Sequence, residues 1–180
     1  MTDRERRYVM EGEAAGFPAR YILSRRRPWH TVEGHLPAPI WAAVFSRKRI
    51  SFILNECGAS HLTTFHGLYP CLAPEFAPAI AAVLNATRVQ ELVRARARPY
   101  GGGLMKLEPR DLLGIPVPNV SLLASWDIAE LRCALHDLSA ALVEAKRESP
   151  AQAALDAIVD RVFLSTMASP TLFRTYPLAR

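Results

Sequence analysis

Cysteine is scarce in this sequence, and its spacing argues against two classes of structure. Cys57, Cys71 and Cys133 are odd in number, lie far apart and contain no Cys-x-x-Cys pair, so neither a disulfide framework nor a zinc site is expected. The five histidines also lack metal-ligand spacing. The loose grouping of His61 and His66 with two of the cysteines is the nearest approach to a metal cluster, and we predict no metal site.

Long apolar runs are missing as well. No window approaches the roughly 18 consecutive apolar residues of a membrane span, and the chain begins with polar and charged residues. A secreted or membrane-spanning chain is therefore not expected. Free thiols suit a reducing compartment, so we predict a cytoplasmic protein without a membrane partner.

Motifs that carry common chemistries are absent too. The sequence has no Gly-x-Gly-x-x-Gly, its glycine run is not followed by Gly-Lys-Ser/Thr, and no nucleophile can be matched with a base. The alternation of strands and helices that builds a doubly wound sheet is not visible. We therefore expect no catalytic residues and no autonomous enzymatic activity from this chain.

What the sequence does contain is an unevenly placed positive charge. Its 180 residues, half of them apolar, suffice for one domain with a core, or for a domain plus a helical appendage. Residues 1–110 hold 16 Lys/Arg and 9 Asp/Glu, a net charge of +7, whereas residues 111–180 hold 6 and 8, a net charge of −2. Nineteen of the 22 cations are arginine. A GC-rich genome would explain the arginine content but not the asymmetry, which favours an anionic partner for the first part of the chain.

The hydrophobic patterns predict an α+β fold: a small antiparallel or mixed β-sheet domain followed by a C-terminal α-helical hairpin. Strands are expected at 20–24, 40–46, 50–56 and 62–69, and the second and third of these form a hairpin with a basic tip at 47–49. Helices are expected at 75–84 and 86–98, then one helical turn at 109–113, an edge strand at 115–118, and a pair of helices at 127–148 and 151–163. We divide the chain into an N-terminal arm (1–19), a sheet-containing domain (20–120), a helical hairpin packed on it (121–164) and a tail (165–180).

Three consecutive glycines, at 101–103, form the most informative segment. Glycine adopts positive φ and lets another surface approach closely, and Lys106 follows with a cation that could meet a phosphate. The simpler interpretation is a flexible or hairpin turn, which turn chemistry favours. Both interpretations stay open at this point.

A second basic segment lies near the N-terminus. Arg25, Arg26 and Arg27 precede Pro28 and Trp29, a combination suited to clamping phosphates with the indole packed beneath. A solvated charge run with Trp29 in the core is an equally good interpretation.

Several segments together resemble a known family. The sequence Tyr-Gly-Gly-Gly-Leu-Met-Lys-Leu-Glu-Pro (100–109), followed by Leu-Gly-Ile-Pro-Val-Pro (113–118), resembles the C-terminal segment of bacterial adenine-specific DNA methyltransferases of restriction–modification systems (type II, Eco57I-like). Two further segments are similar to that family: the basic stretch before Pro28-Trp29 with Pro-Ala-Pro-Ile at 37–40, and the basic turn and strand at 47–55 with Leu-Thr-Thr-Phe-His-Gly-Leu-Tyr-Pro at 62–70. The resemblance runs from about residue 21 to residue 118.

The resemblance implies a target-recognition domain that reads DNA and performs no chemistry. Methyltransferases of this family carry an Asn/Asp/Ser-Pro-Pro-aromatic motif that holds the flipped base, and this chain has no Pro-Pro pair. The implied partners are double-stranded DNA and a catalytic methyltransferase domain on another chain. S-adenosylmethionine would bind that partner domain, and no cofactor is expected on this chain.

The implied DNA-binding residues fall into three groups. Phosphates would be bound by Arg25, Arg26, Arg27, Arg47, Lys48, Arg49 and Lys106. Backbone would approach the groove at Tyr100, Gly101, Gly102 and Gly103. The remaining candidates are Trp29, Asn55, Thr64 and His66.

Two of the family's positions are changed here. The family has a cation two residues after its acid, where this chain has His35, and an Asn before the Thr, where this chain has Thr63, so an adenine-reading amide is not available there. Asn55 suits a structural turn cap better than a base reader because it follows a strand. The rival hypotheses are a protein-interaction module with only general DNA affinity and a non-functional remnant.

Overall fold

A computed structural model describes residues 1–31, 36–144, 148–166 and 173–174 of the chain. By its contacts the chain divides into two compact units, Met1–Gly34 and His35–Arg180. Each unit is described by itself below.

The first unit is helical. Helix α1 (Asp3–Ala14) is followed by the 3₁₀ turns η1 (Phe17–Ala19) and η2 (Leu23–Arg25). A reciprocal capping box starts α1, in which the Thr2 hydroxyl accepts from the Glu5 amide and the Glu5 carboxylate accepts from the Thr2 amide. The helix presents Gly12 to the ring of Trp29, where a Cβ would lie 2.4 Å from a ring carbon.

The strand predicted at 20–24 is wrong, because these residues form turns. A strand is stable only when a neighbour completes its hydrogen bonds, and none of the described residues pairs with this segment. Its polar groups are satisfied locally instead: the Ser24 hydroxyl donates to the Tyr21 carbonyl and the Ser24 amide to the Arg20 carbonyl.

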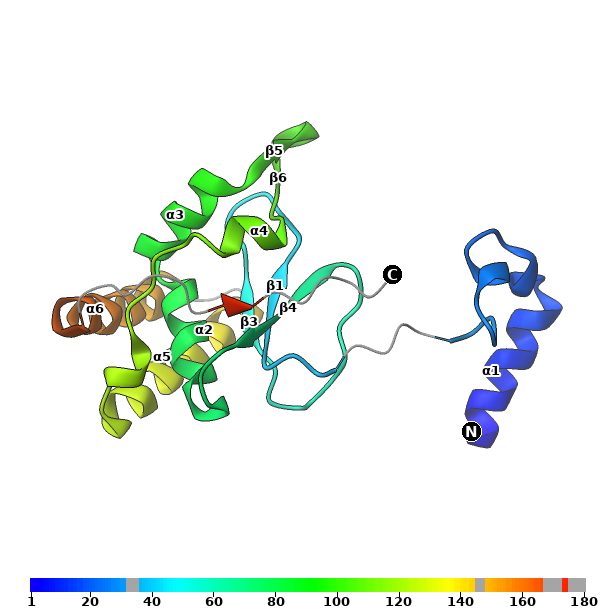
Figure 1. Cartoon of the computed structure of the whole chain (residues 1–180), viewed down its shortest axis with the longest axis horizontal. Helices are drawn as coiled ribbons and strands as arrows, with labels where there is room; N and C mark the ends of the chain where they lie inside the picture. Colours follow the sequence, from blue (N-terminus) through cyan, green and yellow to red (C-terminus); the bar gives the residue numbers. More distant parts are fainter. Residues whose placement is uncertain (32–35, 145–147, 167–172, 175–180) are drawn as a thin grey trace. The chain divides into compact units, whose positions relative to one another are not determined.

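The second unit holds all the described strands (Figure 1). Its strands are β1 (Ile40–Ala43), β2 (Phe45–Ser46), β3 (Phe52–Leu54), β4 (Phe65–Pro70), β5 (Arg98–Tyr100), β6 (Leu104–Lys106) and β7 (Phe173–Arg174). Its helices and 3₁₀ turns are η3 (Pro74–Phe76), α2 (Ala77–Asn85), α3 (Thr87–Arg96), η4 (Gly101–Gly103), α4 (Pro109–Leu112), η5 (Val120–Leu122), α5 (Ser125–Val143) and α6 (Glu148–Thr166).

The second unit contains two small antiparallel sheets, which are joined where β1 leads into β2. The first has the order β3-β1-β4-β7, and the second has the order β2-β6-β5. The predicted hairpin with the basic tip is confirmed, since β1 pairs with β3 in the register Ile40↔Leu54. Between β1 and β2, Val44 ties the sheets together: its amide donates to the Thr64 carbonyl, and its carbonyl accepts from the Leu107 amide.

The outer edge of β3 is covered by side chains from the helices. Because Ala43 donates to the Ser51 carbonyl, the antiparallel alternation turns the backbone groups of Ile50 and Phe52 away from β1. Asn85 takes the place of a neighbouring strand, since its side chain accepts from the Phe52 amide at 3.3 Å and donates to the Phe52 carbonyl at 2.7 Å. Gln90 donates to the Ile50 carbonyl at 2.9 Å. These amides satisfy the edge strand internally.

Helix α2 lies between the first sheet and the helix pair α5–α6 (Figure 1). It is alanine-rich and buried on nearly every side, as a helix between two layers must be. In α5 the buried residues Leu131, Leu135 and Leu138 recur at the spacing of one helix face, and α6 contributes Leu155, Val159 and Val162. The predicted helical hairpin is confirmed, and so is the α+β fold class.

Three other expectations differ from the observed structure. The segment 115–118 forms a single bridge at Val117 instead of a strand, because its two prolines have no amide to donate, while Ile115 and Val117 are buried as expected. The helix predicted to reach residue 98 ends at Arg96, and β5 follows. The tail 165–180 lies largely outside the described residues, although β7 pairs with β4. The domain ranges predicted from the sequence stay a prediction.

Candidate nucleic-acid interface

The second sheet places aromatic and basic side chains on one face. In β2-β6-β5, Phe45 is opposite Lys106, and Lys106 is opposite Arg98. Residues directly opposite each other in a sheet share a face, and so do residues two apart along a strand. Tyr100 therefore joins the same face, which we call the hairpin face: Phe45, Arg98, Tyr100 and Lys106.

The contacts within the hairpin face agree with this register. The rings of Phe45 and Tyr100 meet edge to face, with 5.9 Å between centroids, and Lys106 Nζ lies 5.9 Å from the Phe45 centroid. Phe45 is 45% exposed and Tyr100 is 61% exposed. Two large aromatic rings thus remain open to solvent beside two cations.

Lys106 is held by an ion pair at the base of the hairpin. Its Nζ lies 2.7 Å from Glu108 Oε1, and both side chains are about one-third exposed (35% and 30%). The hydrogen bond from Lys106 lowers the pKa of the Glu108 carboxyl, and the positive charge of Arg98 acts in the same direction. Glu108 also starts α4, because its amide donates to the Asp111 carboxylate. The pair orients Lys106 on the hairpin face.

The glycine run forms the turn between β5 and β6, so the hairpin-turn interpretation is confirmed. Gly102 and Gly103 have φ of 70° and 72°, a region that favours glycine. A Cβ built on any of the three glycines would meet nothing within 4 Å. The turn projects from the body of the second unit (Figure 1). Its glycines therefore do not serve internal packing.

The basic tip of the β1–β3 hairpin follows directly after β2. Arg47 and Lys48 are exposed there. Arg49 is half-buried and differs from them, because its guanidinium donates to the Gln152 side chain and to the Asn85 carbonyl. Arg49 thus anchors the tip to α2 and α6, while Arg47 and Lys48 remain exposed.

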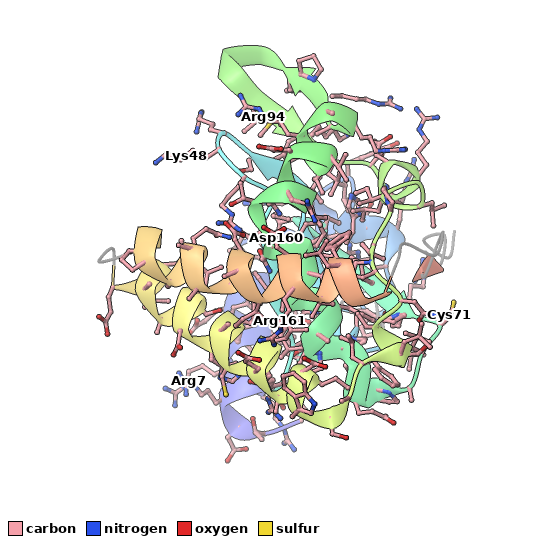
Figure 2. The ribbon with its side chains drawn as sticks, turned by 90° about the vertical axis from the view of Figure 1, so that its left-hand side faces the viewer. Arg7, Lys48, Cys71, Arg94, Asp160 and Arg161 are labelled. Atoms are coloured by element: carbon pink, nitrogen blue, oxygen red, sulfur yellow. The ribbon has the colours of Figure 1, made fainter. Side chains whose placement is uncertain are left out.

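These cations gather at one end of the second unit. Residues 87–106, which cover α3 and the glycine hairpin, hold five Lys/Arg and one Asp/Glu by count from the sequence. Two of the five are paired with acids, Arg88 with Asp160 of α6 and Lys106 with Glu108. Figure 2 shows Lys48 and Arg94 on the side of the β5–β6 hairpin, whereas Asp160 and Arg161 lie along α6. On the helix pair the arginines are matched by acids, as with Arg161 beside Asp127 and Glu130. The excess positive charge is therefore local.

The side chains of two predicted base readers, Asn55 and His66, are engaged within the protein, whereas that of Thr64 is exposed. The Asn55 side chain donates to the carbonyls of Ala38 and Ala59 and accepts from the Ala59 amide, so it acts as the structural turn cap considered above. It also lies at the opposite end of β3 from the basic tip. His66 Nε2 donates to the Leu107 carbonyl at 2.9 Å. Thr64 is exposed in the turn before β4, and its carbonyl accepts from Val44.

The first unit carries the other predicted phosphate-binding arginines. The guanidinium of Arg25 covers the Tyr21 ring at 4.2 Å, and Arg26 donates to the Thr31 carbonyl at 3.0 Å. Arg27 is exposed. Trp29 is half-buried and meets Phe17 edge to face. Trp29 thus packs in its unit, as in the structural interpretation of this segment.

Sequence reasoning missed two members of the hairpin face. The local pattern predicts Phe45 as part of an apolar strand and Arg98 as the end of a helix. The Arg-Pro-Tyr-Gly-Gly-Gly segment contained a signal, since a proline after an arginine favours extended backbone at that arginine. The pairing of β6 with β2, which lies about sixty residues earlier in the chain, left no trace in the local pattern.

The described residues show no site for a metal or for the methyl donor. No group of three or more His, Cys, Asp or Glu that could hold a metal occurs among them. Every strand pair in the described part is antiparallel, unlike the parallel sheet that binds a dinucleotide-like cofactor. The glycine turn borders open space, whereas a cofactor-binding loop would face neighbouring residues that enclose the cofactor. These residues do not fit S-adenosylmethionine. No helix in the described ranges is long and apolar enough to cross a membrane.

Comparisons with known proteins agree with the resemblance seen in the sequence. The family model for the C-terminal domain of the type II methyltransferase M.Eco57I matches residues 1–158. Type II methyltransferase M.AccI of Acinetobacter calcoaceticus is 33% identical over 108 residues, which are 58% of this chain and 20% of M.AccI. Type II methyltransferase M.XamI of Xanthomonas campestris pv. amaranthicola is 32% identical over 123 residues, which are 66% of this chain and 23% of M.XamI.

The chain thus spans about a fifth of the length of the curated relatives it matches. No solved structure matches it. The family model covers most of the chain. The chain belongs to the family of type II DNA methyltransferase C-terminal domains represented by M.Eco57I.

Proposed function

We propose that this domain binds duplex DNA and provides target recognition for an adenine-specific type II methyltransferase, while a separate catalytic domain performs the methyl transfer. The observation that carries the proposal is the local excess of cations at one end of the second unit. Arg47 and Lys48 are exposed and follow directly after β2, the strand that pairs with β6 of the hairpin face. A cluster of exposed cations on one face is the electrostatic footprint of a nucleic-acid-binding protein.

Each part of this surface has a separate role in the proposal. Arg47, Lys48 and Arg98 are exposed and bind phosphates. Lys106 exchanges its Glu108 partner for a phosphate, or binds one while the pair persists. Gly101–Gly103 has no side chains to hold the backbone away from a groove. We leave Arg49 out of the proposed contact surface, because two of its guanidinium N–H groups donate to Asn85 and Gln152.

The first unit provides a second contact through its exposed arginines. Arg25 and Arg27 are exposed, and Trp29 packs against Phe17 within the unit. Two basic surfaces on one chain would hold a longer stretch of duplex than either alone. S-adenosylmethionine and the target base both bind the catalytic domain, on the same polypeptide or on another.

The contact with that catalytic domain is assigned to the helix pair. Leu122 in η5 is 67% exposed, Trp126 at the start of α5 is 61% exposed, and Arg161 covers the Trp126 ring at 5.1 Å. Exposed apolar side chains ringed by charges are typical of protein contacts. Replacing Trp126 by alanine should weaken co-purification with the catalytic domain and leave duplex binding unchanged.

Salt-dependent duplex binding tests the DNA assignment. The double variant Arg47→Ala/Lys48→Ala is compared with the native chain by fluorescence anisotropy at several salt concentrations. Each lost phosphate contact lowers the slope of log K against log salt by about 0.9, so two lost contacts lower it by about 2. Arg132→Ala is the matched control, because that arginine is exposed on α5 and paired with Glu56. An unchanged slope in the double variant would refute the assignment of these two residues.

A further inference from the structure

We propose that the aromatic pair Phe45–Tyr100 on the hairpin face is a stacking site for a nucleobase that has left the duplex stack. The inference rests on the proposed DNA contact and deepens it, because it names the form of DNA that this surface prefers. The ligand is an unpaired base in an otherwise paired duplex, together with the phosphates on either side of it.

The rings have the exposure that stacking requires. An edge-to-face pair leaves part of each π surface uncovered. Phe45 is 45% exposed and Tyr100 is 61% exposed, so both side chains reach solvent. The side chains are held in place, since both residues lie in paired strands and Lys106 sits over the Phe45 ring. Large aromatics in a structured sheet are otherwise directed into a core. Here they share a face with two cations instead.

The cations around the Phe45–Tyr100 pair favour a nucleobase, rather than an apolar protein segment, as its ligand. Arg98 and Lys106 flank the rings on the same face, and Arg47 and Lys48 follow directly after the strand that carries Phe45. An aromatic pair with cations beside it matches the two parts of a nucleotide, a π face and a phosphate. The adjoining glycine turn leaves room for a sugar–phosphate backbone, since nothing lies within 4 Å of where its Cβ atoms would be.

The geometry of stacking decides whether the bound base is paired or unpaired. Within a duplex both faces of each base are covered by its neighbours, so a side-chain ring can stack only on a base that is extruded, bulged or unpaired. Enzymes that act on a base inside DNA extrude it and leave its partner unpaired. A surface that stabilises an unpaired base would therefore lower the cost of opening the duplex.

Three duplexes of one sequence separate stacking from flexibility. The first is fully paired, the second carries one extra unpaired adenine, and the third carries an abasic nucleotide at that position. The native chain should bind the bulged-adenine duplex about tenfold more tightly than the abasic duplex, as expected for one base–aromatic stack. Fluorescence of 2-aminopurine in place of the bulged adenine should fall when the protein binds.

Ring variants with matched controls complete the test. Tyr100→Ala and Phe45→Ala should reduce the tenfold preference to near one, whereas Tyr100→Phe should keep it. Trp126→Ala is the control for an exposed aromatic elsewhere in the same unit, and it should keep the preference too. Circular dichroism confirms that each variant is folded.

The outcomes separate this inference from the function on which it rests. Equal affinity of the native chain for the bulged and abasic duplexes overturns the stacking site, while salt-sensitive duplex binding through Arg47 and Lys48 would still stand. Retention of the preference in both alanine variants also overturns it. Failure of the native chain to bind any of the three duplexes overturns the DNA assignment together with the stacking site.

Discussion

Replacing Asn85 by alanine should remove the hydrogen bonds that join β3 to helix α2 and so destabilise the fold. The Asn85 side chain is 6% exposed and satisfies both outward-facing backbone groups of Phe52, which is itself 3% exposed. It also donates to the Ala81 carbonyl at 2.9 Å. Alanine makes none of these hydrogen bonds and is too short to bring in another partner. The Phe52 amide and carbonyl would then remain buried without partners.

The expected loss in the free energy of unfolding follows from the Phe52 amide and carbonyl, which are left without partners. A buried backbone group left without a partner costs about 1–3 kcal/mol, so two cost about 2–6 kcal/mol. The higher helix propensity of alanine offsets about 0.5 kcal/mol. Against a total stability of about 5–15 kcal/mol, the loss is a large share. With an m-value of about 2 kcal/mol/M in urea, the unfolding midpoint should fall by about 1–3 M.

Urea unfolding followed by circular dichroism measures the midpoint, and amide hydrogen exchange reports on Phe52 itself. The matched control is Asn119→Ala, which removes an amide that caps a surface turn by accepting from Ser121. That change should cost about 1 kcal/mol or less. If the two variants unfold at the same urea concentration and the Phe52 amide exchanges no faster, the reasoning about the covered edge is refuted.

Three further outcomes are expected. The pKa of Glu108 lies below its ordinary value of 4.5 because Lys106 donates a hydrogen bond to its carboxylate. The pair therefore stabilises the fold above about pH 4.5 and loses this contribution as the pH falls through the lower folded pKa. In Lys106→Ala, carbon NMR titration should show the pKa of Glu108 rising toward 4.5. Gly67→Ala should destabilise the sheet by about 1–3 kcal/mol in urea unfolding, since its Cβ would lie 2.5 Å from a ring carbon of His61, and a neutral result would contradict the packing. Gly102→Ala should cost about 1 kcal/mol in thermal unfolding because φ is +70° there, whereas Gly101→Ala, at an ordinary φ, should cost less.

Much of the fold was predictable because its signals are local. The leucines of α5 recur at helical spacing, and the two apolar runs around 47–49 predict a hairpin whose tip is basic. The strand at 20–24 failed for a physical reason: a short run of three apolar residues forms a strand only where a partner strand exists, and the described first unit has none. Strands β5 and β6 were missed because a three-residue strand carries too few residues to show alternation.

The candidate site was predictable only in part. Lys106, Tyr100 and the glycines were found because their residue types are rare together, and Arg47 and Lys48 because they form a basic turn. Arg49 and Asn55 have the same residue types as a phosphate or base contact, yet each is used to hold the protein together. Residue type alone cannot distinguish these roles, since they depend on which acceptors lie nearby.

The sequence by itself determined the family, the α+β class, the helical hairpin and the charge asymmetry, because each depends on residue identity or on spacing along one segment. The tertiary structure decided which residues share a surface. Phe45 and Lys106 are 61 positions apart in the printed sequence, and only the pairing of β2 with β6 places them side by side. Pairing between distant strands is set by packing of the whole domain, so the aromatic and basic hairpin face becomes visible only once the chain is folded.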